Sequence, residues 1–137
     1  MLAFGLMIAG CGGDALDGDL YGEWNGPADA EARVFVYRGF EHCGTQKVSE
    51  LQVHDTAADT RVYYLRDPSG SMAHYTLRAP EPHSGNVDAL PPGARGSGFE
   101  RGGTTLWFAA DYSAAYLVQD GRIERWPRWD WSLTNCD

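Results

Sequence analysis

The stretch "AAYLVQDGRIERW", residues 114–126, carries the clearest fold signal in the chain. Its Asp120-Gly121 dipeptide separates two β-rich runs and suits a two-residue hairpin turn, because both turn positions need a positive φ. Residues 114–118 and 122–126 are therefore predicted to be paired antiparallel strands. Alternation along the second strand places Ile123 and Arg125 on one face, and Glu124 and Trp126 on the other.

Three further β-branched and aromatic runs precede this hairpin and predict strands: residues 33–38, 45–55 and 61–66. A short helix over 47–53 is the alternative for the middle run. The third run leads into Asp67-Pro68-Ser69-Gly70, which fits a type I turn. Residues 73–77 are then the expected partner strand.

Residues 79–98 are rich in proline and glycine and are expected to form a long loop. Beyond them, Gly102-Gly103 separates residues 99–101 from residues 104–108 and predicts a second hairpin, with Trp107 in the core. Together these patterns predict a mainly β, small single domain of six or seven short antiparallel strands. The sheet is expected to be curled or two-layered, with room for one short helix.

The N-terminus has the features of an export signal. Residues 2–9 are almost wholly apolar, which matches the hydrophobic region of a secretion signal and is too short for a transmembrane helix. Ile8-Ala9-Gly10-Cys11 then resembles the lipobox of bacterial lipoproteins, although no Lys or Arg precedes the apolar run. The resemblance implies cleavage before Cys11 and a diacylglyceryl group on its thiol. The alternative is an apolar strand or helix start that contains a cysteine by chance.

This resemblance divides the chain into three parts. Residues 1–10 are a cleaved signal-peptide remnant, residues 11–32 are a lipidated flexible tether, and residues 33–137 are the β-rich domain. The expected location is extracytoplasmic, on the bacterial membrane, with Cys11 contacting membrane lipid. Two or more acyl chains give such an anchor stable attachment.

Cys43 and Cys136 form an even pair once Cys11 is assigned to lipid. Exported proteins keep disulfides, so a Cys43–Cys136 bridge is predicted. It would close a loop of more than ninety residues, which the chain-entropy model relates to roughly 4–5 kcal/mol of stability. Two free thiols are the alternative. The sequence gives even less support to a zinc site, because the chain has neither a C-x-x-C nor an H-x-x-x-H motif.

Several function classes find no support in the sequence. The net charge of −8 argues against nucleic-acid binding, which needs a basic surface. No phosphate-binding, dinucleotide-binding or nucleophile-elbow motif is present, and no cofactor is predicted. His42 and Cys43 are neighbours, but an extended chain points them to opposite faces. The other histidines, His54, His74 and His83, are scattered, so no metal site is predicted.

The aromatic C-terminus is the candidate contact surface. Pro127 interrupts strand pairing after Trp126 and predicts an edge strand or an extended tail. Flat rings beside charged groups suit an envelope glycan or a protein partner. The candidate binding residues are Trp126, Arg128, Trp129 and Trp131. The alternative is that Trp126 and one neighbour are buried in the core.

Two resemblances bear on function. Leu20-x-Gly22-x-Trp24 resembles the G-x-W start of lipocalin-like barrels, in which the tryptophan plugs the barrel base, and this implies a pocket for a small apolar ligand. Three longer stretches resemble an uncharacterised group of small lipoproteins and secreted proteins from actinobacteria-like bacteria, a group that implies no activity: residues 39–44, 64–70 and 123–128.

The expected function is that of a lipid-anchored envelope protein that acts as a non-enzymatic binding or structural module. One alternative is a hydrolase that acts on envelope material, which would need a concave site with perturbed carboxylates or histidines. The other alternative is a lipocalin-like carrier of a small apolar ligand, which would need an apolar cavity.

Overall fold

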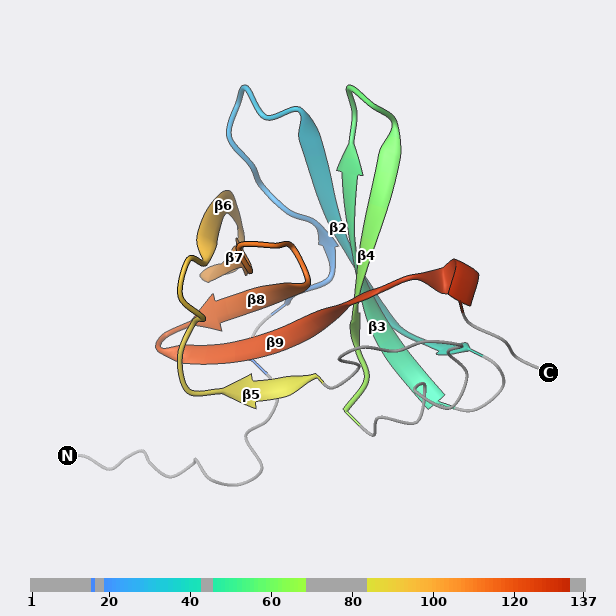
Figure 1. Ribbon diagram of the computed structural model, residues 1–137, viewed down its shortest axis with the longest axis vertical. Helices are drawn as coiled ribbons and strands as arrows, with labels where there is room; N and C mark the ends of the chain where they lie inside the picture. Colours follow the sequence, from blue (N-terminus) through green and yellow to red (C-terminus); the bar gives the residue numbers. More distant parts are fainter. Residues whose placement is uncertain (1–15, 17–18, 43–45, 69–83, 134–137) are drawn as a thin grey trace.

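The computed structural model of the chain describes residues 16, 19–42, 46–68 and 84–133. These residues are mainly β, as the sequence predicts (Figure 1). The elements are β1 (Gly22–Glu23), β2 (Ala32–His42), β3 (Gln46–Asp55), β4 (Thr60–Arg66), β5 (Gly85–Val87), β6 (Arg95–Arg101), β7 (Thr104–Phe108), β8 (Ala114–Gln119), β9 (Arg122–Trp129) and a 3-10 helix, η3 (Trp131–Leu133).

The strands form one antiparallel sheet that curls into a half-barrel (Figure 1). Its order is β1-β2-β3-β4-β9-β8-β7-β6, with β5 paired to β9. Two meanders, β1–β4 and β6–β9, are therefore joined through β4 and β9. The two outer edges meet at one bridge, where Asn25 and Glu100 exchange two backbone hydrogen bonds of 2.9 Å. This bridge brings residues near the N-terminus against β6.

Both hairpins expected from turn chemistry are confirmed. Asp120 and Gly121 have φ angles of 50° and 81°, and Gly102 and Gly103 have 56° and 83°. Positive φ at both turn positions matches the right-handed twist of the flanking strands. The alternation expected in β9 is also confirmed, because Glu124 and Trp126 are 2% and 0% exposed whereas Ile123 and Arg125 are half-buried.

The run at 45–55 contains a strand and not a helix, because β3 pairs with β2 on one side and with β4 on the other.

The long loop expected at 79–98 is wrong in part. Gly85–Val87 pairs with β9, and β6 begins within the same segment, where Arg95 pairs with Phe108. Gly98 has a φ of 83° where the β6–β7 register shifts, so glycine marks a bulge here and not a loop. The strand expected at 73–77 lies outside the described residues.

The flexible tether expected at 11–32 is wrong for its described part. Leu16, Leu20 and Trp24 are 7%, 4% and 2% exposed and belong to the main core. The Trp24 amide donates to Val34 O at 2.8 Å, and Trp24 Nε1 donates to Leu20 O at 2.8 Å. Burying three large apolar side chains outweighs the glycine-rich and aspartate-rich composition around them. The folded domain therefore begins well before residue 33.

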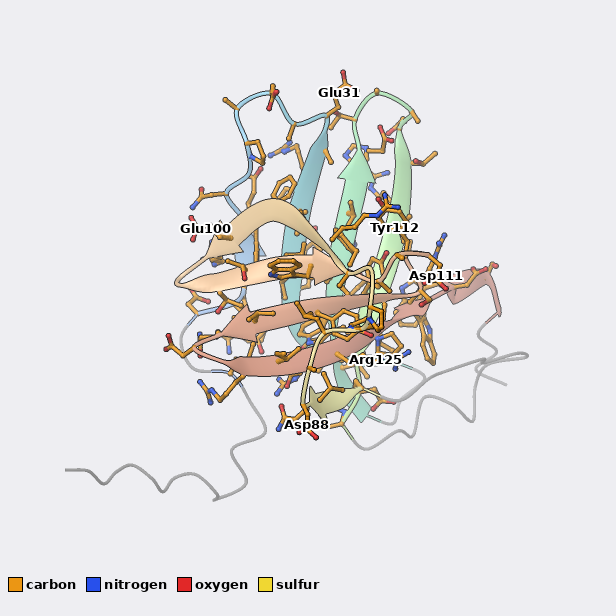
Figure 2. The ribbon with its side chains drawn as sticks, turned by 60° about the vertical axis from the view of Figure 1, so that its left-hand side comes forward. Glu31, Asp88, Glu100, Asp111, Tyr112 and Arg125 are labelled. Carbon is orange, nitrogen blue, oxygen red and sulfur yellow. The ribbon has the colours of Figure 1, made fainter. Side chains whose placement is uncertain are left out.

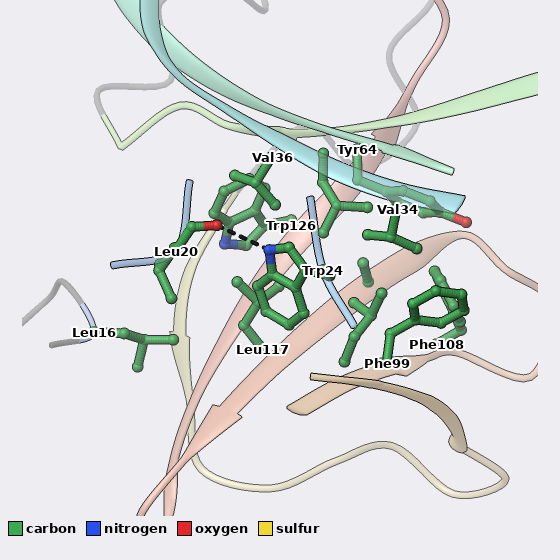
Figure 3. Packing of buried hydrophobic residues seen from close by; sticks show 13 residues of the cluster. Leu16, Leu20, Trp24, Val34, Val36, Tyr64, Phe99, Phe108, Leu117 and Trp126 are labelled. Carbon is green, nitrogen blue, oxygen red and sulfur yellow. Dashed lines mark hydrogen bonds between the residues drawn. The ribbon is translucent and has the colours of Figure 1, made fainter. Parts of the chain in front are cut away.

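The inner face of the curled sheet holds the main core (Figure 3). Its large side chains come from both meanders and from the N-terminal segment, and they fill the interior: Leu20, Trp24, Val34, Val36, Leu51, Tyr64, Leu106, Leu117 and Trp126. Figure 3 shows this cluster running from Leu16 at one end to Phe108 and the Tyr64 hydroxyl at the other. Beyond this second end the interior opens to solvent.

Candidate functional site

A pocket of about 370 Å³ lies at that open end, between the β3–β4 hairpin and the turn that joins β7 to β8. We call it the mouth pocket. Figure 2 shows Asp111 and Tyr112 together on the β7–β8 turn. The residues that line the pocket are Val53, Asp55, Thr60, Val62, Tyr64, Phe108, Asp111, Tyr112 and Arg128.

The walls of the mouth pocket are apolar. On one side, Val53 of β3 and Val62 of β4 stand opposite each other in the sheet register, and both side chains are half-buried. On the other side, three rings follow one another. The Tyr64 and Phe108 ring centroids are 5.5 Å apart, and those of Phe108 and Tyr112 are 5.6 Å apart. The pocket can therefore hold a small group that is apolar on both faces.

Tyr64 fixes one wall. Its side chain is buried, and its hydroxyl donates to Tyr112 O at 3.1 Å. Burial raises the pKa of Tyr64 to about 12, against a smaller opposing effect of the Arg128 charge. The phenol therefore stays protonated at neutral pH and acts as a hydrogen-bond donor to the turn, and not as a base.

Tyr112 has an unfavourable backbone conformation. Its φ of 60° lies in the left-handed region, which bulky side chains seldom adopt. The turn is held by Ala109 N donating to Ala114 O at 3.0 Å and by Tyr112 N donating to Ala109 O at 2.9 Å. Such strain costs roughly 1–3 kcal/mol and concentrates at functional sites. The result is a tyrosine ring that is 44% exposed at the edge of an apolar pocket.

The two acidic side chains at the rim have structural roles. Asp55 Oδ1 accepts the Ala57 and Ala58 amides at 3.0 Å each, which closes the β3–β4 turn. Asp111 Oδ1 accepts the Ser113 amide at 3.0 Å. Hydrogen bonds from Ser113 hold the pKa of Asp111 below its usual value, so this carboxylate is ionised at neutral pH.

The structure does not form the expected tryptophan platform. Alternation along β9 sends Trp126 and Arg128 to the inner face and Trp129 to the outer face. Trp126 is 0% exposed, so the alternative that places it in the core is what the structure shows. Trp129 is also buried and packs with Val48 and Leu65, with Trp131 half-buried beside them. Trp131 Nε1 donates to the Glu50 carboxylate.

The edge or tail expected after Pro127 is wrong as well. Pro127 is the last β9 residue paired with β8, opposite Ala114. Arg128 N still donates to Ser113 O at 2.9 Å on that side, and on its other edge β9 pairs with β4 at Arg128 and Trp129, so the strand joins the two meanders here. Pro127 lacks an amide donor, and it stands between the residues of β9 that pair with β5, which end at Arg125, and those that pair with β4, which begin at Arg128. Of the four expected surface residues, only Arg128 reaches the mouth pocket.

The cysteines of the expected lipid and disulfide sites, Cys11, Cys43 and Cys136, lie outside the described residues, as do His74 and His83. His54 Nε2 lies 2.9 Å from the Asp59 carboxylate at the tip of the β3–β4 hairpin. Within the described ranges no three His, Cys, Asp or Glu side chains gather as a metal site, and no helix there is long and apolar enough to cross a membrane.

The sequence reasoning missed the other mouth-pocket residues, above all Tyr64, Phe108, Asp111 and Tyr112. They come from two meanders and one turn, so no local spacing connects them. Comparisons of the chain with protein-family models, curated proteins and solved structures give no match.

Proposed function

We propose that this protein is a non-enzymatic binding module and that its ligand occupies the mouth pocket. The observation that carries the proposal is the pocket itself. Its volume of about 370 Å³ falls in the range of small-molecule sites, and its walls are apolar with a few polar groups at the rim. The strained, exposed Tyr112 ring adds to this, because such a conformation persists only where surrounding structure supports it.

The ionisable groups of the mouth pocket favour binding over catalysis. Tyr64 has a raised pKa and bonds to the turn. Asp55 and Asp111 are exposed and accept backbone hydrogen bonds in their own turns. A hydrolase needs a nucleophile or a carboxyl pair whose environments push their pKa values apart. The mouth pocket is closer to the small-ligand site that the resemblance of residues 20–24 implies than to a hydrolase site. Its ligand would sit at the mouth, because core side chains fill the centre.

The proposal includes the membrane anchor. A lipid on Cys11 would precede Leu16, the first described core residue, by five positions, and five extended residues span at most roughly 18 Å. Leu16 and Phe108 lie at opposite ends of the core cluster (Figure 3). An anchored domain would therefore sit close to the membrane with its mouth pocket turned away from the anchored end, where a ligand or envelope partner in the aqueous phase can reach it.

Filling the mouth pocket is expected to abolish ligand binding. The probe is phenylnaphthylamine, a small neutral fluorophore whose emission rises in apolar sites. We expect saturable binding by the wild type and a loss of at least about tenfold in affinity for Thr60→Trp, because an indole at this exposed rim position would occupy the space between the two walls. Fluorescence titration measures both constants.

The matched control is Arg61→Trp. Arg61 is the next residue of β4 and faces the opposite side of the sheet, opposite His54. The affinity of the Arg61→Trp variant for the probe should stay within about twofold of that of the wild type. Equal loss in both variants, or no saturable binding by the wild type, would contradict the mouth pocket as the ligand site.

The anchor has its own test, the intact mass of native protein extracted from membranes without reduction. We expect the mass of residues 11–137 with a diacylglyceryl group on Cys11, less two hydrogens for the Cys43–Cys136 bridge. An unmodified chain of 137 residues in the soluble fraction would contradict the anchor and leave the proposed mouth-pocket function untouched.

A further inference from the structure

We infer that the ligand of the mouth pocket is a singly charged amphipathic anion, with an apolar body held between the pocket walls and its carboxylate or sulfonate bound by Arg128. This inference rests on the proposed function and adds the chemistry of the ligand. It is carried by the position of Arg128 and by the carboxylates that line the same pocket.

Arg128 occupies an inward-facing position of a strand that is otherwise buried on that face. The residues two and four places earlier, Trp126 and Glu124, are 0% and 2% exposed. Arg128 stands opposite Tyr64 in the sheet register, and directly paired residues share a face. The core ends at this point, so the guanidinium lies at the edge of the mouth pocket, exposed to solvent.

Three other arginines of the described residues have carboxylate partners, and two more, Arg38 and Arg95, lie over tyrosine rings. Arg33 pairs with Glu23 at 2.9 Å, Arg66 with Glu124 at 3.2 Å and Arg101 with Asp19 at 3.1 Å. Across the described residues, Arg128 takes part in no such ion pair, although the chain carries a net charge of −8.

Asp111, which lines the same pocket, and Asp130, two residues further along the chain, are already bonded elsewhere. Asp111 accepts the Ser113 amide, and Asp130 accepts both the amide and the hydroxyl of Ser132. The Arg128 charge lowers the pKa of Asp130 only as the weakest of several effects, after those two hydrogen bonds. A guanidinium in this position has donors left for an external anion, which it can bind through two parallel hydrogen bonds.

The rim also limits the charge of the ligand. Asp55 and Asp111 line the same pocket as Arg128, so two carboxylates stand near one guanidinium. A second negative charge on the ligand would face these carboxylates, and the further cation at this rim, Arg95, is held over the Tyr112 ring at 5.8 Å from its centroid and does not line the pocket. A monoanion with an apolar body therefore fits the mouth pocket better than a phosphate ester or a dicarboxylate.

The test compares two probes of similar shape, neutral phenylnaphthylamine and the anionic anilinonaphthalene sulfonate, on the full chain. We expect Arg128→Gln to weaken the sulfonate probe by about tenfold and the neutral probe by less than about twofold. The control is Arg61→Gln, which removes the same charge from the opposite face of the hairpin and should leave both affinities within about twofold of the wild type.

Equal weakening of both probes by Arg128→Gln, or no weakening of either, would overturn the inference while the proposed function stands. Absence of saturable binding of both probes to the wild type would instead overturn the proposed function itself. If Arg128→Gln does not fold, a salt titration of the wild type decides. The affinity for the sulfonate probe should fall with ionic strength and that for the neutral probe should not, and parallel behaviour of the two would overturn the inference.

Discussion

Replacement of Trp24 by alanine is expected to destabilise the protein by about 3–5 kcal/mol, the cost of removing a fully buried tryptophan. Trp24 is 2% exposed, packs in the main core, and donates from Nε1 to Leu20 O at 2.8 Å. Its removal would leave a cavity between the two meanders and release the bond that holds the segment around Leu20. Equilibrium unfolding by chemical denaturant measures the change in the free energy of unfolding.

Tyr37→Ala is the control, because Tyr37 is a large aromatic residue of the same sheet that is 45% exposed. It should cost much less than Trp24→Ala, since exposed side chains gain little from burial. If the two variants proved equally mild, residues 19–25 would be a tether after all, as their composition suggests, and the domain would begin near residue 33.

Trp126→Ala should be at least as damaging, again by about 3–5 kcal/mol. Trp126 is 0% exposed, and its Nε1 donates to Glu124 Oε1 at 2.8 Å. Arg66 Nε lies 3.2 Å from the same carboxylate oxygen. The indole therefore fills the interior and also helps to satisfy a buried charge, and alanine would remove both contributions.

Trp126→Phe separates the two contributions. Phenylalanine keeps most of the apolar volume but has no donor for Glu124, so a loss of about 1–3 kcal/mol is expected. Thermal and denaturant unfolding of both variants check that Trp126→Ala loses more stability than Trp126→Phe. A Trp126→Ala variant as stable as the wild type would contradict the burial of Trp126. It would instead support the tryptophan-rich end as a contact surface.

The hairpins could be predicted from sequence because their causes are local. Asp120-Gly121 and Gly102-Gly103 supply the positive φ that each turn requires. Alternation then assigned the faces of the strand that follows, and Glu124 and Trp126 are buried on the same face as expected. Turn chemistry and a period of two residues are properties of a short stretch and need no knowledge of the rest of the chain.

The N-terminal segment could not be predicted in this way. Its regular structure is the two-residue strand β1, which is far too short to give a periodic signal. What holds it is distant, namely pairing with β2 and the bridge from Asn25 to Glu100. Similarly, β5 is paired with β9 in spite of the proline and glycine around it. Composition misled in both places because tertiary pairing overrides local preference.

The candidate site could not be predicted from the sequence for a related reason. The sequence drew attention to residues 126–131 as one aromatic cluster, but strand alternation divides them between the two faces of the sheet. The mouth pocket instead collects Val62, Phe108 and Arg128 from three strands. The positive φ of Tyr112 at this pocket has no sequence signature, because neither glycine nor asparagine stands there.

The most direct test of the central claim, that the mouth pocket is the ligand site, is an amide chemical-shift titration of the isotope-labelled protein with phenylnaphthylamine. We predict saturable shifts gathered at Val53, Thr60, Val62 and residues 109–113, which surround the pocket. Shifts gathered instead on the outer face of the sheet, around Phe35, Tyr37 and Tyr63, or the absence of any saturable shift, would contradict it.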